Sequence, residues 1–182
     1  MSTNAAGRTV DVIAQCLEET LSLGRRIGQF AHGGQCIAIE GMLGTGKTQL
    51  VRGICLGAQI ADVSLVNSPS YVLLNVYDAM PENPKSKTVF HLDAYRVNNS
   101  SDFVAVGLPE ILEQDGIVAI EWASRVTDLL PDDYLLIQGE TLDESARRWR
   151  ITALGPNTEY LLKAITRTDF SGTTLESTAK RQ

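Results

Sequence analysis

Basic residues are in the minority in this sequence of 182 residues, with 16 Lys and Arg against 22 Asp and Glu and a net charge of −6. Because an acidic surface repels phosphate backbones, we do not expect the chain to hold RNA or DNA by itself. Long apolar runs are missing too. None approaches the roughly 18 residues of a membrane span, and residues 1–10 lack the apolar core of a signal peptide. The chain is therefore expected to be cytoplasmic.

Cysteine is scarce and scattered. The three cysteines are Cys16, Cys36 and Cys55, and no C-x-x-C pair occurs. An odd count without metal-binding spacing predicts reduced, buried thiols. The sequence also lacks internal repeats and low-complexity tracts, and its length suits one domain with a substantial core. We place that domain at residues 10–166 and interpret the polar, Ser- and Thr-rich residues 167–182 as a mobile tail.

Apolar stretches of strand length alternate with segments of helical periodicity. The expected strands are residues 35–40, 66–77, 89–93, 117–121, 134–138 and 149–154. The expected helices are residues 10–31, 48–56, 100–112 (interrupted near 107–109) and 123–130, with one more short helix after 156. Residues 81–87 are predicted to form a polar loop, at a hairpin tip or in a crossover. This alternation predicts an α/β fold with a mostly parallel sheet and helices on both faces.

One segment, Gly41 to Thr48, carries a specific chemical signal. Its sequence, G-M-L-G-T-G-K-T, fits the phosphate-binding pattern G-x-x-x-x-G-K-[ST] between a predicted strand and a predicted helix. The glycines let the backbone curl until several N–H groups point at one phosphate, and the helix N-terminus adds free donors. Lys47 can reach the β- and γ-phosphates, and the Thr48 hydroxyl can bind Mg²⁺. The segment predicts a single P-loop NTPase-like domain. The expected nucleotide-binding residues are Gly41, Leu43, Gly44, Thr45, Gly46, Lys47, Thr48 and Gln49.

Two further predicted strands end in carboxylates, Asp93 and Glu121, each after four mostly apolar residues. Because ligands collect beyond the carboxyl ends of parallel strands, both acids should lie beside the P-loop. P-loop enzymes use such an acid to hold Mg²⁺, directly or through water, and another group to orient the attacking water. The residues alone do not say which acid has which role. Neither His32 nor His91 has matching ligands at metal-binding spacing, so no role is predicted for them.

The loop after the P-loop helix contains Ser68-Pro69-Ser70. P-loop switches place a hydroxyl near the γ-phosphate at this point, so Ser68 and Ser70 are candidates for nucleotide contact. An ordinary proline turn before a strand is the alternative. Arg96 could touch phosphate or form a surface salt bridge. Trp122 could belong to the core or face a partner or a base.

In this order, the motifs resemble those of one family, the bacterial TsaE (YjeE) proteins of tRNA threonylcarbamoyladenosine biosynthesis, over roughly residues 17–154. The segments that carry the resemblance are Glu19-Thr20 with Gly24, the loop Gly41 to Thr48, Ser68-Pro69-Ser70, His91-Leu92-Asp93-Ala94-Tyr95-Arg96, and Glu121-Trp122. Many proteins share the loop, whereas the ordered set is far more specific. Two positions depart from the family pattern: Ser70 stands where Thr is usual, and Met42 replaces the common Asp. Residues 167–182 have no family counterpart.

The resemblance implies a small α/β P-loop ATPase that binds Mg-ATP and hydrolyses it slowly. It implies docking on a TsaB–TsaD heterodimer, whose TsaD subunit transfers threonylcarbamoyl to the adenosine beside the anticodon, so that tRNA is met only through the partners. By the same resemblance, Thr48 and Glu121 would hold Mg²⁺ and Asp93 would serve as the Walker B acid. The expected catalytic residues are then Lys47, Asp93 and Glu121.

Two other functions use the same loop. A small-molecule P-loop kinase needs a second substrate pocket and a lid, usually rich in arginine. Between Gly41 and Glu121 only Arg52 and Arg96 occur, in no arginine-rich segment. A nucleotide-sensing adaptor that does not hydrolyse ATP would share every residue with the ATPase, and only a turnover measurement separates the two. A GTPase is disfavoured because the chain has no Asn-Lys-x-Asp motif.

Overall fold

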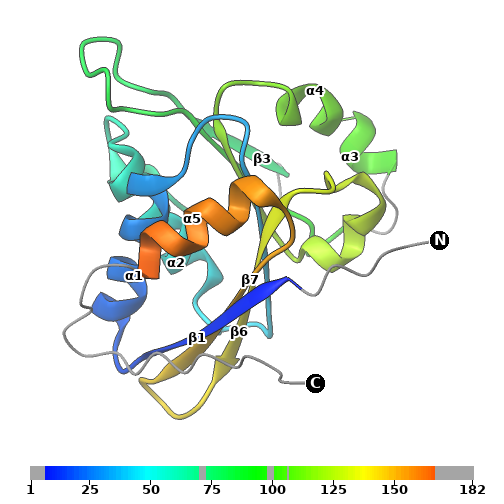
Figure 1. Ribbon diagram of the computed structural model, residues 1–182. Coiled ribbons are helices and arrows are strands. Elements are labelled where there is room, and N and C mark those ends of the chain that lie inside the picture. Colours follow the sequence, from blue (N-terminus) through cyan, green and yellow to red (C-terminus); the bar gives the residue numbers. More distant parts are fainter. Residues whose placement is uncertain (1–6, 70–72, 98–100, 106, 167–182) are drawn as a thin grey trace.

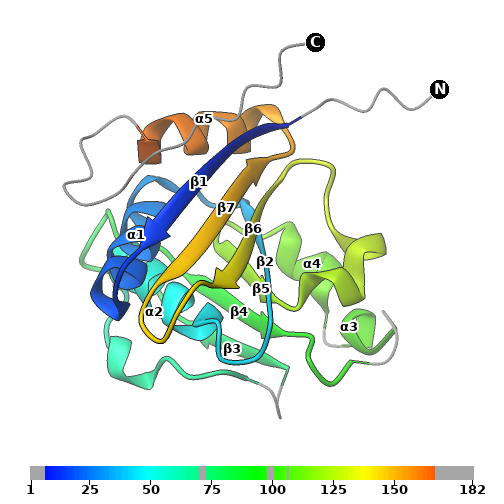
Figure 2. The same ribbon diagram turned by 90° about the horizontal axis from the view of Figure 1, so that it is seen from below.

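The computed structural model describes residues 7–69, 73–97, 101–105 and 107–166. Its centre is a seven-stranded sheet (Figure 1). The strand order is β1-β7-β6-β2-β5-β4-β3, which can be followed in Figure 2. The strands are β1 (Arg8–Ala14), β2 (Cys36–Gly41), β3 (Leu74–Tyr77), β4 (Val89–Asp93), β5 (Ile117–Glu121), β6 (Tyr134–Thr141) and β7 (Arg147–Ala153). The central strands β6, β2, β5 and β4 are parallel. Antiparallel pairs extend this core at both edges, through β7 and β1 on one side and β3 on the other.

Helices cover both faces of the sheet (Figure 2). One face packs against α1 (Leu17–Phe30), α2 (Lys47–Ala58) and α5 (Pro156–Thr166). The other packs against α3 (Ser101–Ala105), α4 (Leu108–Leu112) and the 3-10 helix η2 (Ala123–Leu129). Residues of β2 alternate between the two cores: Ile37 and Ile39 belong to the first, and Cys36 and Ala38 to the second. A strand buried on both faces is apolar throughout, which explains its uninterrupted apolar sequence. The expected α/β fold is confirmed.

The helix predicted over residues 10–31 is wrong in its first third. Val10, Val12 and Ala14 are buried on β1, which pairs antiparallel with β7, and α1 begins only at Leu17. Apolar residues here fit both a three- to four-residue period and a two-residue period. The sheet decides between them, because β-branched Val and Ile pack well on a pleated surface.

The strand predicted over residues 66–77 is also too long. Within the described residues only Leu74–Tyr77 form β3, and the short 3-10 helix η1 (Val63–Leu65) lies before the loop. Pro69 cannot donate a backbone hydrogen bond to a sheet ladder. Residues 81–87 connect the antiparallel strands β3 and β4, so the hairpin alternative is the correct one. Residues 98–100 and the tail predicted at 167–182 lie outside the described part of the chain.

All three cysteines are free. Cys36 and Cys55 are buried, and burial raises the pKa of each thiol to about 12. In the described ranges, no helix combines the length and the apolar character needed to cross a bilayer.

Helices α1 and α2 touch through glycines spaced four residues apart. A Cβ atom on Gly24 or Gly28 of α1 would lie 2.3 Å and 2.0 Å from the carbonyl oxygens of Leu50 and Ile54. The glycines of α2 are equally close to the backbone of α1: a Cβ atom on Gly53 would lie 2.4 Å from the Leu21 carbonyl oxygen. The backbones therefore approach more closely than any side chain permits. This contact fixes α2, the helix that follows the P-loop, against the rest of the domain.

Replacing Gly28 with alanine tests the backbone contact. Alanine is favoured over glycine in a helix interior by about 1 kcal/mol, so an uncrowded site would gain stability. Here we expect Gly28→Ala to lower the free energy of unfolding by about 1–3 kcal/mol, because overpacking displaces one helix. Urea denaturation measures the change, with the exposed Gln29→Ala as a control that should stay within about 0.5 kcal/mol of wild type. A more stable Gly28→Ala protein would contradict the packing.

Candidate functional site

The predicted functional residues that the structure describes lie beyond the carboxyl ends of β2, β4 and β5. Asp93 and Glu121 are register partners on neighbouring strands, and Glu121 also lies opposite Ile39 of β2. A cavity of about 550 Å³ opens at this edge. Its lining contains Leu43, Gly44, Gly46, Lys47, Thr48, Gln49, Ser68, Asp93 and Glu121 from the predicted set, together with Tyr95, Arg96 and Trp122.

The loop between β2 and α2 has the backbone that its glycines permit. Gly41, Gly44 and Gly46 have positive φ values of 146°, 81° and 99°. These conformations are strained for residues with a Cβ atom and are open to glycine. The Thr45 hydroxyl and backbone N–H both donate to the Met42 carbonyl, at 2.6 Å and 3.2 Å, and close the turn. Gly41 and Thr45 thus shape the loop without lining the cavity.

Lys47 lies folded against its own loop. It is buried, and its ammonium group donates to the carbonyl oxygens of Gly41 at 2.8 Å and Met42 at 3.1 Å. The same group sits 3.9 Å from the centroid of the Trp122 ring, a cation–π contact. Burial lowers the pKa of Lys47, an effect that the nearby acids Glu121 and Asp93 oppose.

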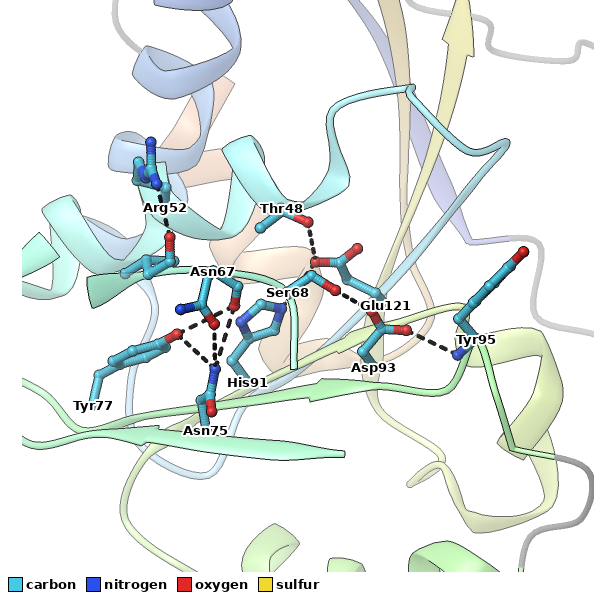
Figure 3. A network of polar contacts seen from close by, with 11 residues as sticks. Thr48, Arg52, Asn67, Ser68, Asn75, Tyr77, His91, Asp93, Tyr95 and Glu121 are labelled. Atoms are coloured by element: carbon cyan, nitrogen blue, oxygen red, sulfur yellow. Dashed lines mark hydrogen bonds and ion pairs between the residues drawn. The ribbon is translucent and has the colours of Figure 1, made fainter. Parts of the chain in front are cut away.

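Glu121 joins the P-loop helix to the sheet (Figure 3). Its Oε1 accepts a hydrogen bond of 2.8 Å from the Thr48 hydroxyl, and the same oxygen lies 2.9 Å from Nε2 of His91. His91 is completely buried on β4, two residues before Asp93. Sequence reasoning gave His91 no role because it looked for metal ligands, whereas the side chain here contacts a carboxylate.

Asp93 contacts the loop that contains Ser68. The Ser68 hydroxyl donates to Oδ2 of Asp93, and the backbone N–H of Tyr95 donates to Oδ1 at 2.8 Å. Ser68 therefore lines the cavity beside Asp93, and its contact with a nucleotide stays a prediction. Ser70, the second hydroxyl predicted for nucleotide contact, lies outside the described residues.

Polar side chains hold the Ser68 loop in place (Figure 3). Arg52 of α2 donates to the Val66 carbonyl at 2.8 Å. Asn75 of β3 donates to the Oδ1 of Asn67 at 3.1 Å. The loop is thus tied both to the P-loop helix and to an edge strand. No sequence motif marks these contacts, because each joins residues from separate elements.

Large apolar side chains are exposed in and beside the cavity lining. Met42 and Leu43 at the tip of the P-loop are 78% and 77% exposed. Tyr95 is also exposed, and its ring lies 5.1 Å from that of Trp122 at an angle of 45°. Trp122 has a left-handed backbone (φ 58°) and is partly buried against the second core. Trp122 therefore packs on the core and also lines the cavity. Its contact with a partner or a base stays a prediction.

A second cavity, of about 300 Å³, lies on the other side of the P-loop. It shares Gly44, Gly46 and Gln49 with the first cavity, and it also borders Thr45. The remaining lining residues are Cys16, Leu17, Thr20, Glu144, Ser145 and Arg147. They come from the start of α1 and, more than a hundred residues later, from the β6–β7 turn and the first residue of β7. None was predicted as a site residue, although Thr20 lies in a segment that carries the family resemblance.

The oxygen groups at the first cavity suit magnesium. The Thr48 hydroxyl and the Glu121 carboxylate are 2.8 Å apart, with Asp93 on the next strand. Within the described ranges no group of three or more His, Cys, Asp or Glu could hold a metal ion. Mg²⁺ fits this sparse set, because it usually binds through one or two carboxylates together with waters and substrate phosphates.

Comparison with known proteins agrees with this geometry. Residues 14–149 match the family model described as "Threonylcarbamoyl adenosine biosynthesis protein TsaE". A tRNA threonylcarbamoyladenosine biosynthesis protein TsaE from Bacillus subtilis (strain 168) is 30% identical over 152 residues, which cover 84% of this chain and 90% of the relative. Its counterpart from Aquifex aeolicus (strain VF5) is 33% identical over 141 residues, covering 78% and 94%. The crystal structure of YdiB from Bacillus subtilis matches with a TM-score of 0.73 at 25% identity, covering 88% of this chain and 96% of that one. The chain belongs to the TsaE family.

Proposed function

We propose that this protein is a Mg-ATP-binding accessory subunit of tRNA threonylcarbamoyladenosine biosynthesis that hydrolyses ATP slowly and docks on a TsaB–TsaD heterodimer. One observation carries the proposal: the glycine-shaped loop places Thr48 on Glu121 and Lys47 beside it, in one cavity. Membership of the TsaE family supports the pathway.

The P-loop residues would bind the phosphates. The backbone N–H groups of the loop residues Gly44 and Gly46, and those of Lys47 and Thr48 at the start of α2, would donate to phosphate oxygens. The positive end of the helix dipole would help them. Lys47 would exchange the Gly41 and Met42 carbonyls for the β- and γ-phosphate oxygens. The ammonium group of Lys47 is thus hydrogen-bonded with and without nucleotide. The ring of Trp122 can keep its cation–π contact with Lys47 in both states.

Thr48 and Glu121 would hold Mg²⁺, which when bound neutralises charge on the β- and γ-phosphates. Asp93 would not bind the metal directly but would act through a water molecule. Its carboxylate is oriented by Ser68 and by the Tyr95 N–H, so it faces the cavity beside Glu121 and can accept a hydrogen bond from the attacking water. The contact between Thr48 and Glu121 supports this division of roles.

The second cavity suits the nucleoside end of the substrate. Phosphates seated with their γ end at Lys47 and Thr48 would leave the loop on the side of Gln49, which borders both cavities. There Thr20 is buried and its oxygen accepts from Nε1 of Trp149 at 3.3 Å. Because indole only donates, the Thr20 hydroxyl proton remains available to an acceptor on the base.

The rim of the first cavity favours a protein partner. Leu43 and Tyr95 line the cavity and are exposed, Met42 next to Leu43 is exposed as well, and the ring of Tyr95 contacts that of Trp122. Apolar and aromatic side chains of this kind anchor protein interfaces. The cationic side chains in the lining are Lys47 and Arg96, which disfavours a kinase with a closing arginine-rich lid. An accessory subunit whose site is completed from outside fits better, and RNA would then be held by the partners.

Lys47→Ala tests the P-loop assignment. The loop backbone keeps its glycine-determined shape, but one positive charge at the phosphates is lost. We expect the rate of phosphate release from ATP to fall by roughly 10²–10³-fold, the usual loss when one electrostatic stabiliser is removed. Lys85→Ala, an exposed lysine far from the loop in sequence, is the control and should behave as wild type. A wild-type rate in Lys47→Ala would refute the assignment. No hydrolysis by the wild-type protein, with ATP still bound, would favour the adaptor.

Conservative amide substitutions separate the two acids. Glu121→Gln removes a proposed magnesium ligand, whereas Asp93→Asn alters a group that acts through water. We expect Glu121→Gln to raise the Mg²⁺ concentration needed for half-maximal ATP hydrolysis more than Asp93→Asn does, and Asp93→Asn to lower mainly the maximal rate. Magnesium titrations of the two variants and the wild type measure this. Two curves that superimpose on wild type would show the division to be wrong.

A further inference from the structure

We propose that His91 is a positioning residue for the magnesium site: it holds the Glu121 carboxylate in the orientation needed to bind the metal. The inference rests on the proposed function and goes beyond it, because it assigns a role to a side chain that contacts neither the phosphates nor the metal. Its basis is the hydrogen bond between Nε2 of His91 and Oε1 of Glu121, 2.9 Å long and fully buried.

The direction of that hydrogen bond follows from the chemistry of the two groups. An ionised carboxylate only accepts, so Nε2 of His91 must carry the proton and donate. Thr48 donates to the same oxygen at 2.8 Å. Oε1 therefore receives two donors from opposite elements, the sheet and the P-loop helix. Oε2 has no hydrogen bond from the described residues, which leaves it available to the cavity.

The backbone makes the position of His91 rigid. His91 and Asp93 lie two residues apart on β4, so their side chains point to the same face of the sheet. Asp93 is the register partner of Glu121, which places His91 one step behind the pair. Both strands are fully buried. The histidine thus approaches Glu121 from the protein interior, on the side away from the solvent.

The other ring nitrogen argues against a purely structural role. Nδ1 of His91 is buried and has no hydrogen-bond partner among the described residues. The ring of Tyr77 is tilted against the imidazole at 6.3 Å between centroids. Burying an unsatisfied nitrogen costs free energy, and an aromatic hydrocarbon such as Phe would pack there without that cost. The histidine is explained by what its Nε2–H does for Glu121.

Loss of the donor should act on the metal. Groups that orient a metal ligand typically contribute 10–100-fold to metal affinity, because a misoriented ligand must be reordered when the metal binds. Without His91, the Thr48 hydroxyl would be the remaining donor to Oε1 of Glu121. That hydroxyl would be lost as a partner once it binds the metal. Affinity for Mg²⁺ should then fall, whereas the phosphate contacts of the P-loop backbone and Lys47 remain.

The test compares three substitutions at residue 91. His91→Gln places an amide N–H close to the position of Nε2, His91→Asn has the same chemistry but is too short to reach Glu121, and His91→Phe fills the space without a donor. His32→Asn is the matched control, because His32 is the other histidine in the chain and is exposed. Binding of a fluorescent ATP derivative is measured at equilibrium, first in EDTA and then across a Mg²⁺ titration, and thermal melts check the fold.

We expect His91→Asn and His91→Phe to raise the Mg²⁺ midpoint by about 10-fold or more. Their ATP affinity in EDTA should equal that of wild type. His91→Gln should restore the midpoint to within about 3-fold of wild type, and His32→Asn should leave it unchanged. A wild-type midpoint in His91→Asn and His91→Phe would overturn the role. So would an equal loss of ATP binding in EDTA, or a failure of His91→Gln to restore the midpoint in a folded protein. If the wild-type protein itself bound ATP without any effect of Mg²⁺, the proposed function would fail as well.

Discussion

The hydrogen bond between the Thr48 hydroxyl and the Glu121 carboxylate joins the first turn of α2 to the end of β5. The proposed magnesium site depends on this closeness, which brings the phosphate-binding loop and the acidic edge of the sheet within reach of one metal ion. Two features support it from either side. The glycine contact between α1 and α2 fixes the helix, and the buried strand pair β4–β5 fixes the carboxylate. Neither support is part of the P-loop motif itself.

Much of this arrangement can be predicted from the sequence because its causes are local. Strands β4 and β5 have the predicted ends, since each is a short apolar run that stops at a carboxylate. The P-loop follows from its glycines. Residues 10–14 are different: their apolar pattern fits a helix as well as a strand, and only pairing with β7 determines which one forms. Propensity is a weak guide when a sheet edge is available.

The residues that escaped prediction contribute through distant contacts. His91 forms no recognisable metal motif, and its partner lies 30 residues further along the chain. Thr20 and Arg147 come to the second cavity from opposite ends of the domain. Arg147 donates to the Thr45 carbonyl at 3.2 Å and so connects the β6–β7 turn to the P-loop, a contact that depends on the register of three strands. The register between strands cannot be obtained from one sequence by itself.

The proposed role combines a site of few charges with an apolar rim and an acidic chain. The cavity lining holds two cationic side chains, Lys47 and Arg96, and two acids, Asp93 and Glu121. So small a set of charges is consistent with slow hydrolysis and with a site completed by partners. The most direct measurement is a reconstitution of tRNA modification with this protein, a TsaB–TsaD heterodimer and its substrates. The account predicts many modified tRNAs per heterodimer with Mg-ATP, and about one when a nonhydrolysable ATP analogue replaces it. Equal yields with ATP and the analogue, or the same yield when this protein is omitted, would contradict it.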